Sequence, residues 1–81
     1  MKTARQVFRD NLLQHMENAD MIGAELSRRL NHDRKTVSNY TSGKYLPRAQ
    51  EMWMIARILG TTMDALMEGY TEEMYYEDIK G

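Results

Sequence analysis

The apolar positions near the start of the chain recur with the period of a helix. They stand four residues apart, at Ala4, Phe8, Leu12 and Met16. Residues with this spacing share one face of an α-helix, so we expect a first helix over about residues 3–17. No segment alternates apolar and polar residues for long enough to predict a strand. The pattern as a whole therefore indicates an all-α fold.

Four more helices are predicted by the same period together with signals for helix ends. We expect them over about residues 22–30, 34–41, 48–59 and 63–68. Asp33 and Thr62 are residue types that cap helix N-termini, and Pro47 suits a first helical turn. Glycines that can end helices stand at Gly43, Gly60 and Gly69. The expected architecture is a compact five-helix domain over residues 1–69.

The last segment, residues 70–81, differs in composition from the rest. It mixes apolar side chains with acidic ones, and the apolar set is Tyr70, Met74, Tyr75, Tyr76 and Ile79. These residues are too apolar for a plainly disordered tail, while the acidic residues between them favour the surface. We interpret the segment as an acidic, tyrosine-containing C-terminal tail.

Length and composition limit what the chain can be. Its 81 residues make one small domain, and 42% hydrophobic residues are enough for a packed core. There is no cysteine, so disulfides and thiolate metal sites are excluded. No apolar run approaches the roughly 18–20 residues that span a bilayer, and no signal-peptide stretch follows residues 1–5. We expect a soluble cytoplasmic protein with no membrane partner.

The formal net charge of −1 conceals an uneven distribution. Residues 21–48 carry six basic side chains against two acidic ones, a local charge of +4. Residues 70–81 carry four acidic side chains against one lysine, a local charge of −3. Local charge decides contact with phosphate because salt screens each charge beyond about 8 Å. The basic middle of the chain therefore remains compatible with nucleic-acid binding.

The second and third predicted helices are joined by only about three residues, the spacing of a helix-turn-helix. Two helices that cross this closely need a small residue at the crossing, and Ser27 is small. The short turn needs a residue that tolerates positive φ, and Asn31 is one of the few non-glycine types that does. Residues 21–48 are therefore predicted to form a helix-turn-helix.

The third predicted helix has one face made entirely of hydrogen-bonding residues. At 100° per residue, that face spans about 140° and holds Arg34, Lys35, Ser38, Asn39 and Ser42. Val37 and Tyr40 fall on the opposite side. The major groove of B-DNA accepts a helix, and there arginine pairs with guanine and asparagine with adenine. Beyond the helix, Lys44, Tyr45 and Arg48 are placed to contact phosphates.

At these residues the chain resembles the lambda repressor and Cro type of helix-turn-helix domain, the XRE family. The resemblance spans roughly residues 5–69, and its anchors, in order, are Glu25-Leu26-Ser27, Leu30, Thr36-Val37-Ser38-Asn39-Tyr40, Gly43-Lys44, Pro47, Ile55-Ala56, Leu59-Gly60 and Asp64-Ala65-Leu66. It implies a five-helix fold that binds double-stranded operator DNA as a homodimer. By the same resemblance, Arg34, Lys35, Ser38 and Asn39 read bases, and Ser42, Lys44 and Arg48 contact phosphates.

Five positions depart from the family pattern. Ser27 and Asn31 replace the usual alanine and glycine, and both fit sterically. Gly23 stands where the family often has a phosphate-contacting glutamine, and Ile22 stands where it usually has a threonine or serine cap. We therefore expect the second helix to be capped earlier, by Asp20. Thr41 replaces a common glutamate, which puts one buried salt bridge in doubt.

A dimer needs an apolar surface outside the core. On the helical wheel Met54 and Ile58 face away from the core side of the fourth helix, so either the fifth helix and the tail cover them or a second subunit does. We favour the second subunit, with Trp53, Met54, Ile58, Tyr70 and Met74 as candidate interface residues.

The sequence therefore predicts a transcriptional regulator, a repressor of phage, mobile-element or bacterial origin that binds a palindromic operator. Two alternatives stay open: a restriction-modification controller, and an antitoxin or other interaction module that binds a protein partner through the tail. No catalytic motif is present, and the acidic pairs of the tail lie near no nucleophile, so we do not expect an enzyme. Two histidines without cysteine favour neither a metal site nor a cofactor.

Overall fold

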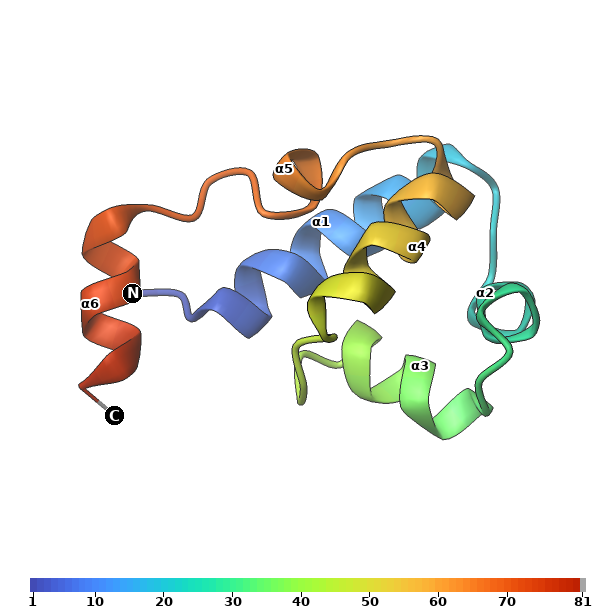
Figure 1. Cartoon of the computed structure of the whole chain (residues 1–81), viewed down its shortest axis with the longest axis horizontal. Coiled ribbons are helices and arrows are strands. Elements are labelled where there is room, and N and C mark those ends of the chain that lie inside the picture. Colours follow the sequence, from blue (N-terminus) through green and yellow to red (C-terminus); the bar gives the residue numbers. More distant parts are fainter. Residues whose placement is uncertain (81) are drawn as a thin grey trace.

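The computed structural model describes residues 1–80 of the chain, and within them all regular structure is helical. The six helices are α1 (Ala4–Asn18), α2 (Gly23–Leu30), α3 (Arg34–Thr41), α4 (Ala49–Leu59), α5 (Met63–Leu66) and α6 (Glu72–Ile79). The longest helix, α1, runs through the middle of the molecule, with α3 below it, α4 in front of it and α5 above it (Figure 1). The all-α fold expected from the hydrophobic pattern is confirmed.

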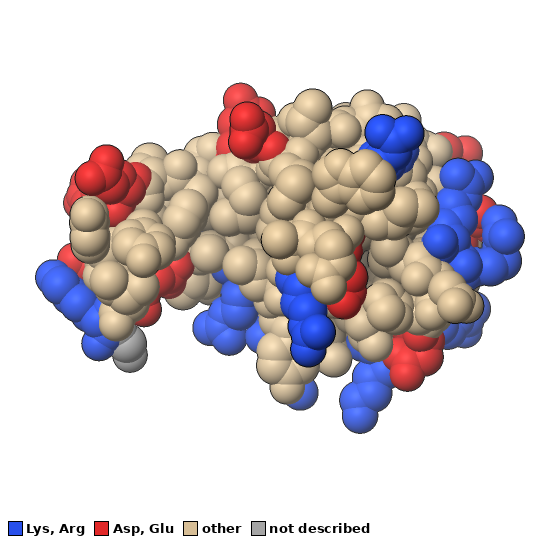
Figure 2. Space-filling view, in the orientation of Figure 1, with Lys and Arg blue, Asp and Glu red and all other residues tan. Residues whose placement is uncertain are grey.

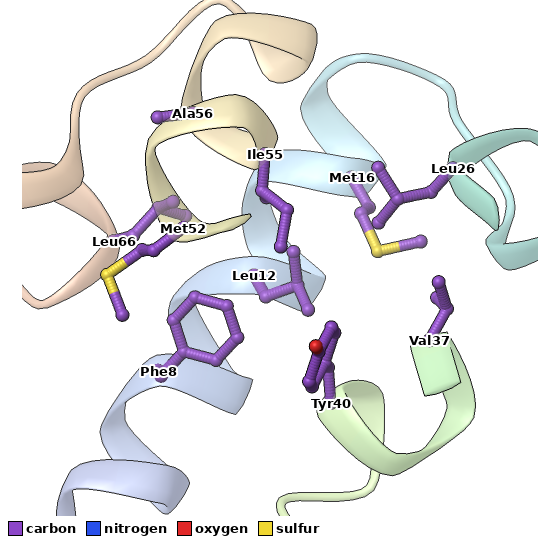
Figure 3. Close-up of a cluster of buried hydrophobic side chains, with 10 residues drawn as sticks. All are labelled: Phe8, Leu12, Met16, Leu26, Val37, Tyr40, Met52, Ile55, Ala56 and Leu66. Carbon is purple, nitrogen blue, oxygen red and sulfur yellow. The ribbon is translucent and has the colours of Figure 1, made fainter. Parts of the chain in front are cut away.

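The hydrophobic core lies where α1, α2, α3 and α4 meet, and α5 closes it at one end (Figure 3). Each helix from α1 to α5 contributes to it, and the buried side chains are Phe8, Leu12, Met16, Leu26, Val37, Tyr40, Met52, Ile55, Ala56 and Leu66. Three of the four residues of the predicted first stripe belong to this cluster, and Ala4 is only half-buried. The predicted face of the first helix therefore points inward, as its periodicity required, whereas Ile22, which the same period places on the inner face of the second helix, is exposed.

Most helix ends follow the predicted caps. Asp33 caps α3 by accepting a hydrogen bond from the Thr36 amide, and Thr62 caps α5 by accepting one from the Ala65 amide. Gly60 ends α4 in the left-handed region at φ 70°. A capping box between Thr3 and Gln6 starts α1, which satisfies two of the amide groups that a helix N-terminus leaves unpaired.

Three expected boundaries are wrong. Asp20 does not cap α2: it lies in the turn at φ 53°, and the N-cap is Ile22, which has no side chain able to accept the bond. Pro47 precedes the N-cap Arg48 and does not enter the first turn of α4. Helix α5 ends at Leu66, three residues before Gly69.

Residues 72–79 add a sixth helix to the five expected. Thr71 caps α6, and Asp78 on α6 accepts hydrogen bonds from the amide of Ala4 (2.8 Å) and from the Tyr70 hydroxyl (2.7 Å). Partial burial and this carboxylate raise the pKa of Tyr70 to about 12. The segment is thus attached to the N-terminus of α1, at the end of the molecule away from α2 (Figure 1). Gly81, the last residue of the predicted tail, lies outside the described residues.

None of the helices in residues 1–80 is both long enough and apolar enough to cross a membrane.

Candidate nucleic-acid interface

Helices α2 and α3 are joined by a tight turn that begins with a left-handed residue. Asn31 has φ 58° and ψ 39°, and the following amide, that of His32, donates to the carbonyl of Ser27 at 3.0 Å. Ser27 is buried, with its hydroxyl bonded to the Gly23 carbonyl at 2.9 Å. The prediction that asparagine takes the positive φ of the turn is confirmed, and the small residue Ser27 is buried on α2.

Helix α3 divides into a buried and an exposed face along the predicted line. Val37 and Tyr40 are buried, and the ring of Tyr40 meets that of Phe8 edge-on at 6.5 Å between centroids. Figure 3 shows both residues of α3 pointing into the cluster. The opposite face is open to solvent at Arg34, Lys35, Ser38 and Ser42, whereas Asn39 is half-buried.

The exposed cations of α3 differ from those of α2. Arg28 and Arg29 both pair with Glu25 on their own helix, and the Arg29 contact is 2.8 Å. Within residues 1–80, Arg34 and Lys35 make no ion pair and no side-chain hydrogen bond. The donors at the start of α3 are therefore available to a ligand. In Figure 2, lysine and arginine side chains extend below the molecule on the side of α3, where acidic side chains also lie, and further acidic side chains stand at the top and at the α6 end.

The loop after α3 is shaped by Gly43 and by the carbonyl of Asn39. Gly43 has φ 78°, and the amides of Lys44 and Tyr45 both donate to the Asn39 carbonyl, at 2.9 and 3.2 Å. The chain thus turns back on α3, and it leaves Lys44, Tyr45 and Arg48 exposed. The ammonium group of Lys44 lies 5.6 Å from the centre of the Tyr45 ring. The hydroxyl of Ser42, by contrast, donates to the Asn39 carbonyl at 3.3 Å.

Two arginines of α1 support this loop, and sequence reasoning missed both. Arg5 donates to the Lys44 carbonyl at 3.2 Å. A Cβ atom at Gly43 would meet Cδ of Arg9 at 3.3 Å, so Arg9 covers the turn closely. Their positions on the polar side of α1 gave no signal, because the contacts join residues more than 30 positions apart in the sequence.

A third unforeseen contact ties α4 to both ends of α3. Glu51, in the first turn of α4, accepts a hydrogen bond from the Tyr40 hydroxyl at 2.5 Å. The same oxygen lies 3.1 Å from Nε2 of His32, in the turn before α3. Burial and this carboxylate raise the pKa of Tyr40 well above its usual range, so the hydroxyl stays protonated and donates.

The five residues predicted for a dimer interface do not form one patch. Trp53 and Met54 are exposed on α4, where Arg57 stacks on the Trp53 ring at 5.1 Å, while Ile58 is partly buried against the core. Tyr70 and Met74 belong to the α6 end of the molecule, which Figure 1 shows well apart from α4. Two separate surfaces are therefore available, one on α4 and one on α6.

Acidic and histidine side chains within residues 1–80 nowhere gather into a group of three or more that could hold a metal ion.

Comparison with known proteins identifies the same segment. The helix-turn-helix family model HTH_3 matches residues 12–66, which is more than half of the chain. No curated protein matches the chain.

Solved structures of much longer proteins share the fold. The crystal structure of apo-HppE matches with a TM-score of 0.75 and 29% identity, over 80% of this chain and 36% of that one. The structure of hydroxypropylphosphonic acid epoxidase from S. wedmorenis matches with a TM-score of 0.75 and 29% identity, over 83% of this chain and 36% of that one. The chain thus spans about a third of the length of these proteins.

Proposed function

The chain belongs to the Cro/C1-type helix-turn-helix family, known as HTH_3 or XRE, whose members are DNA-binding regulators, and on that premise we propose that it is a sequence-specific repressor. The observation that carries the proposal is the exposed face of α3. It places unpaired cationic donors at the helix N-terminus and leaves a hydrogen-bonding surface uncovered. We propose that this face enters the major groove, with Arg34, Lys35, Ser38 and Asn39 reading base edges.

The loop after α3 supplies the contacts that fix register. Lys44, Tyr45 and Arg48 are exposed beside α3, so they face the sugar-phosphate backbone when α3 lies in the groove. Ser42, also predicted to contact phosphate, is the weakest candidate for such a contact, because its hydroxyl already donates to the Asn39 carbonyl. Phosphate contacts of this kind contribute affinity on every sequence and make it depend on salt.

Two copies of the chain would bind one operator. A dimer places two recognition helices in successive major grooves about 34 Å apart, so its operator is a palindrome. The exposed Trp53 and Met54 on α4 support this assembly, because large apolar side chains on a surface favour a partner. Bound at an operator that overlaps a promoter in the cytoplasm, the dimer would block transcription.

Selection from a random duplex library tests the proposal directly. We expect the full chain to enrich one sequence in the form of an inverted repeat, with half-site centres about 10 base pairs apart. A single unrepeated half-site would contradict the dimer and leave sequence-specific binding intact. Failure to enrich any sequence over bulk DNA would contradict specific regulation.

The α6 surface favours a second candidate function, binding of a protein partner. Tyr75, Tyr76 and Ile79 are each about half exposed or more, at 49%, 51% and 61%. The rings of Tyr75 and Tyr76 pack edge-on at 5.4 Å, so their apolar surfaces lie together. An apolar patch on a helix that is attached to the domain through Asp78 is typical of an interaction site.

Substitution of this surface separates the two functions. Deleting α6 is a poor test, because it also removes the hydrogen bond that Asp78 accepts from the amide of Ala4 at the start of α1. Replacing Tyr75, Tyr76 and Ile79 with serine leaves that bond in place. We expect the triple variant to lose any protein that copurifies with the wild type in its host, and to keep its DNA affinity within about twofold. Capture of the same proteins by both chains, identified by mass spectrometry, would contradict the second function; a Glu72→Gln variant is the control.

A further inference from the structure

Glu51 holds a position from which one carboxylate oxygen reaches both ends of α3. His32 lies two residues before α3 begins, and Tyr40 lies in its last turn. The distances from Oε2 of Glu51 are 3.1 Å to the imidazole of His32 and 2.5 Å to the Tyr40 hydroxyl. Glu51 itself is fixed to α4, whose inner face is buried in the core through Met52 and Ile55. The contact therefore links α3 to a helix whose inner face is held in the core.

The rest of the α3–α4 boundary offers little apolar packing. Helix α3 packs mainly on α1 and α2 through Val37 and Tyr40. On the α4 side a cavity of about 410 Å³ opens instead, and its walls are Thr36, Asn39, Tyr40, Tyr45, Leu46 and Arg48, with Glu51. Since this space is not filled by apolar side chains, the hydrogen bonds to Glu51 supply the restraint that packing does not.

Small displacements of α3 matter because base reading has strict geometry. A bidentate contact needs two hydrogen bonds in line at once, and each weakens steeply as its angle falls toward 120°. Functional constellations must be held within about 0.5 Å and 10–20° of the productive arrangement. An eight-residue helix with only two buried side chains cannot meet that requirement through its own stability.

We propose that Glu51 is a positioning residue for DNA recognition, which fixes the orientation of α3 through Tyr40 and His32. It touches no base. It also supplies the acidic support that Thr41 lacks in this chain. The inference rests on the proposed DNA-binding function and deepens it, because it assigns sequence discrimination to a residue outside the helix-turn-helix.

Substitutions at Glu51 and Tyr40 separate the hydrogen bond from the charge. Glu51→Ala and Glu51→Gln remove the same negative charge near DNA, but the amide oxygen of glutamine still accepts from Tyr40. Tyr40→Phe removes the hydroxyl and keeps the ring that packs on Phe8. Glu68→Gln, an exposed change on the connection between α5 and α6, controls for charge at a distance.

The measurement is the ratio of affinities for the duplex obtained by selection and for its scrambled sequence. A hydrogen bond of this kind contributes a threefold to tenfold factor, so we expect Glu51→Ala and Tyr40→Phe to lower the ratio by about 3–10-fold. Glu51→Gln should restore it to within about twofold of the wild type. The double variant Tyr40→Phe/Glu51→Ala should lose no more than Glu51→Ala alone, because that substitution already removes the bond to Tyr40 together with the contact to His32.

The outcomes distinguish this inference from the function on which it rests. Equal ratios for folded Glu51→Ala and Glu51→Gln would overturn the positioning role. If Glu51→Ala does not fold, Tyr40→Phe decides, since it keeps the ring that packs in the core. An unchanged ratio of affinities for Tyr40→Phe would overturn the positioning role as well. A wild-type chain that prefers no duplex over scrambled DNA would overturn the proposed function itself, and the inference with it.

Discussion

Replacing Phe8 with alanine is expected to lower the free energy of unfolding by about 3–5 kcal/mol. The side chain is completely buried, and it projects from α1 into the cluster that contains Met52 of α4 and the ring of Tyr40 (Figure 3). Its removal loses the transfer free energy of the ring and leaves a cavity that surrounding helices can close only in part. A domain of this size has a total stability of about 5–10 kcal/mol, so the variant should be near its folding limit.

Urea denaturation followed by circular dichroism measures this effect, and α1 supplies a matched control. Leu13 lies on the same helix but is 44% exposed, so Leu13→Ala should cost much less. Phe8→Leu should fall between the two, because leucine fills part of the ring's volume. If Phe8→Ala costs no more than Leu13→Ala, the cluster around α1 is not the core of the domain.

The helices of the bundle could be predicted because their signals are local. The stripe through Phe8, Leu12 and Met16 has the period of a helix, and burial of that face follows from it. Asp33 and Thr62 cap helices as expected because the bond that each accepts comes from an amide three residues away. Asn31 takes positive φ for reasons that lie in its own side chain.

The wrong or missing boundaries depend on contacts that no local pattern contains. Helix α6 is attached to the fold by Asp78, which reaches Ala4, 74 residues earlier in the sequence. The segment also carries a weak periodic signal, since none of its residues is fully buried. The cap expected at Asp20 follows from its residue type and from the lack of a capping side chain at Ile22, but the turn places Asp20 in the left-handed region, outside the helix.

The candidate site also contains residues that a local pattern predicts and residues that only long-range contacts reveal. The exposed face of α3 follows from helical geometry and from the residue types at Arg34, Lys35 and Ser38, so the sequence was enough to locate it. The residues that support it could not be found, because Glu51 reaches Tyr40 across 11 positions and His32 across 19. Periodicity predicts which residues share a helix face; it does not predict which residues of two helices meet.

Replacing Arg34 with alanine is expected to weaken binding to the selected duplex by about 1–3 kcal/mol, or roughly 5–150-fold. The guanidinium group is exposed at the N-terminus of α3 and has no partner within residues 1–80. In the major groove it can donate two parallel bonds to guanine O6 and N7, the geometry that a lysine cannot reproduce. The variant should therefore lose discrimination at one base position, where it should tolerate all four bases.

Lys44→Ala is the matched variant, since it removes one exposed positive charge from the neighbouring loop and no base contact. It should weaken binding to every duplex by a similar factor and reduce the slope of log affinity against log salt by about one. Titrations of both variants, with the selected and the scrambled duplex at several salt concentrations, make the comparison. Equal losses on both duplexes for Arg34→Ala would show that Arg34 contacts only phosphate, and α3 would then have to read its operator through Lys35, Ser38 and Asn39.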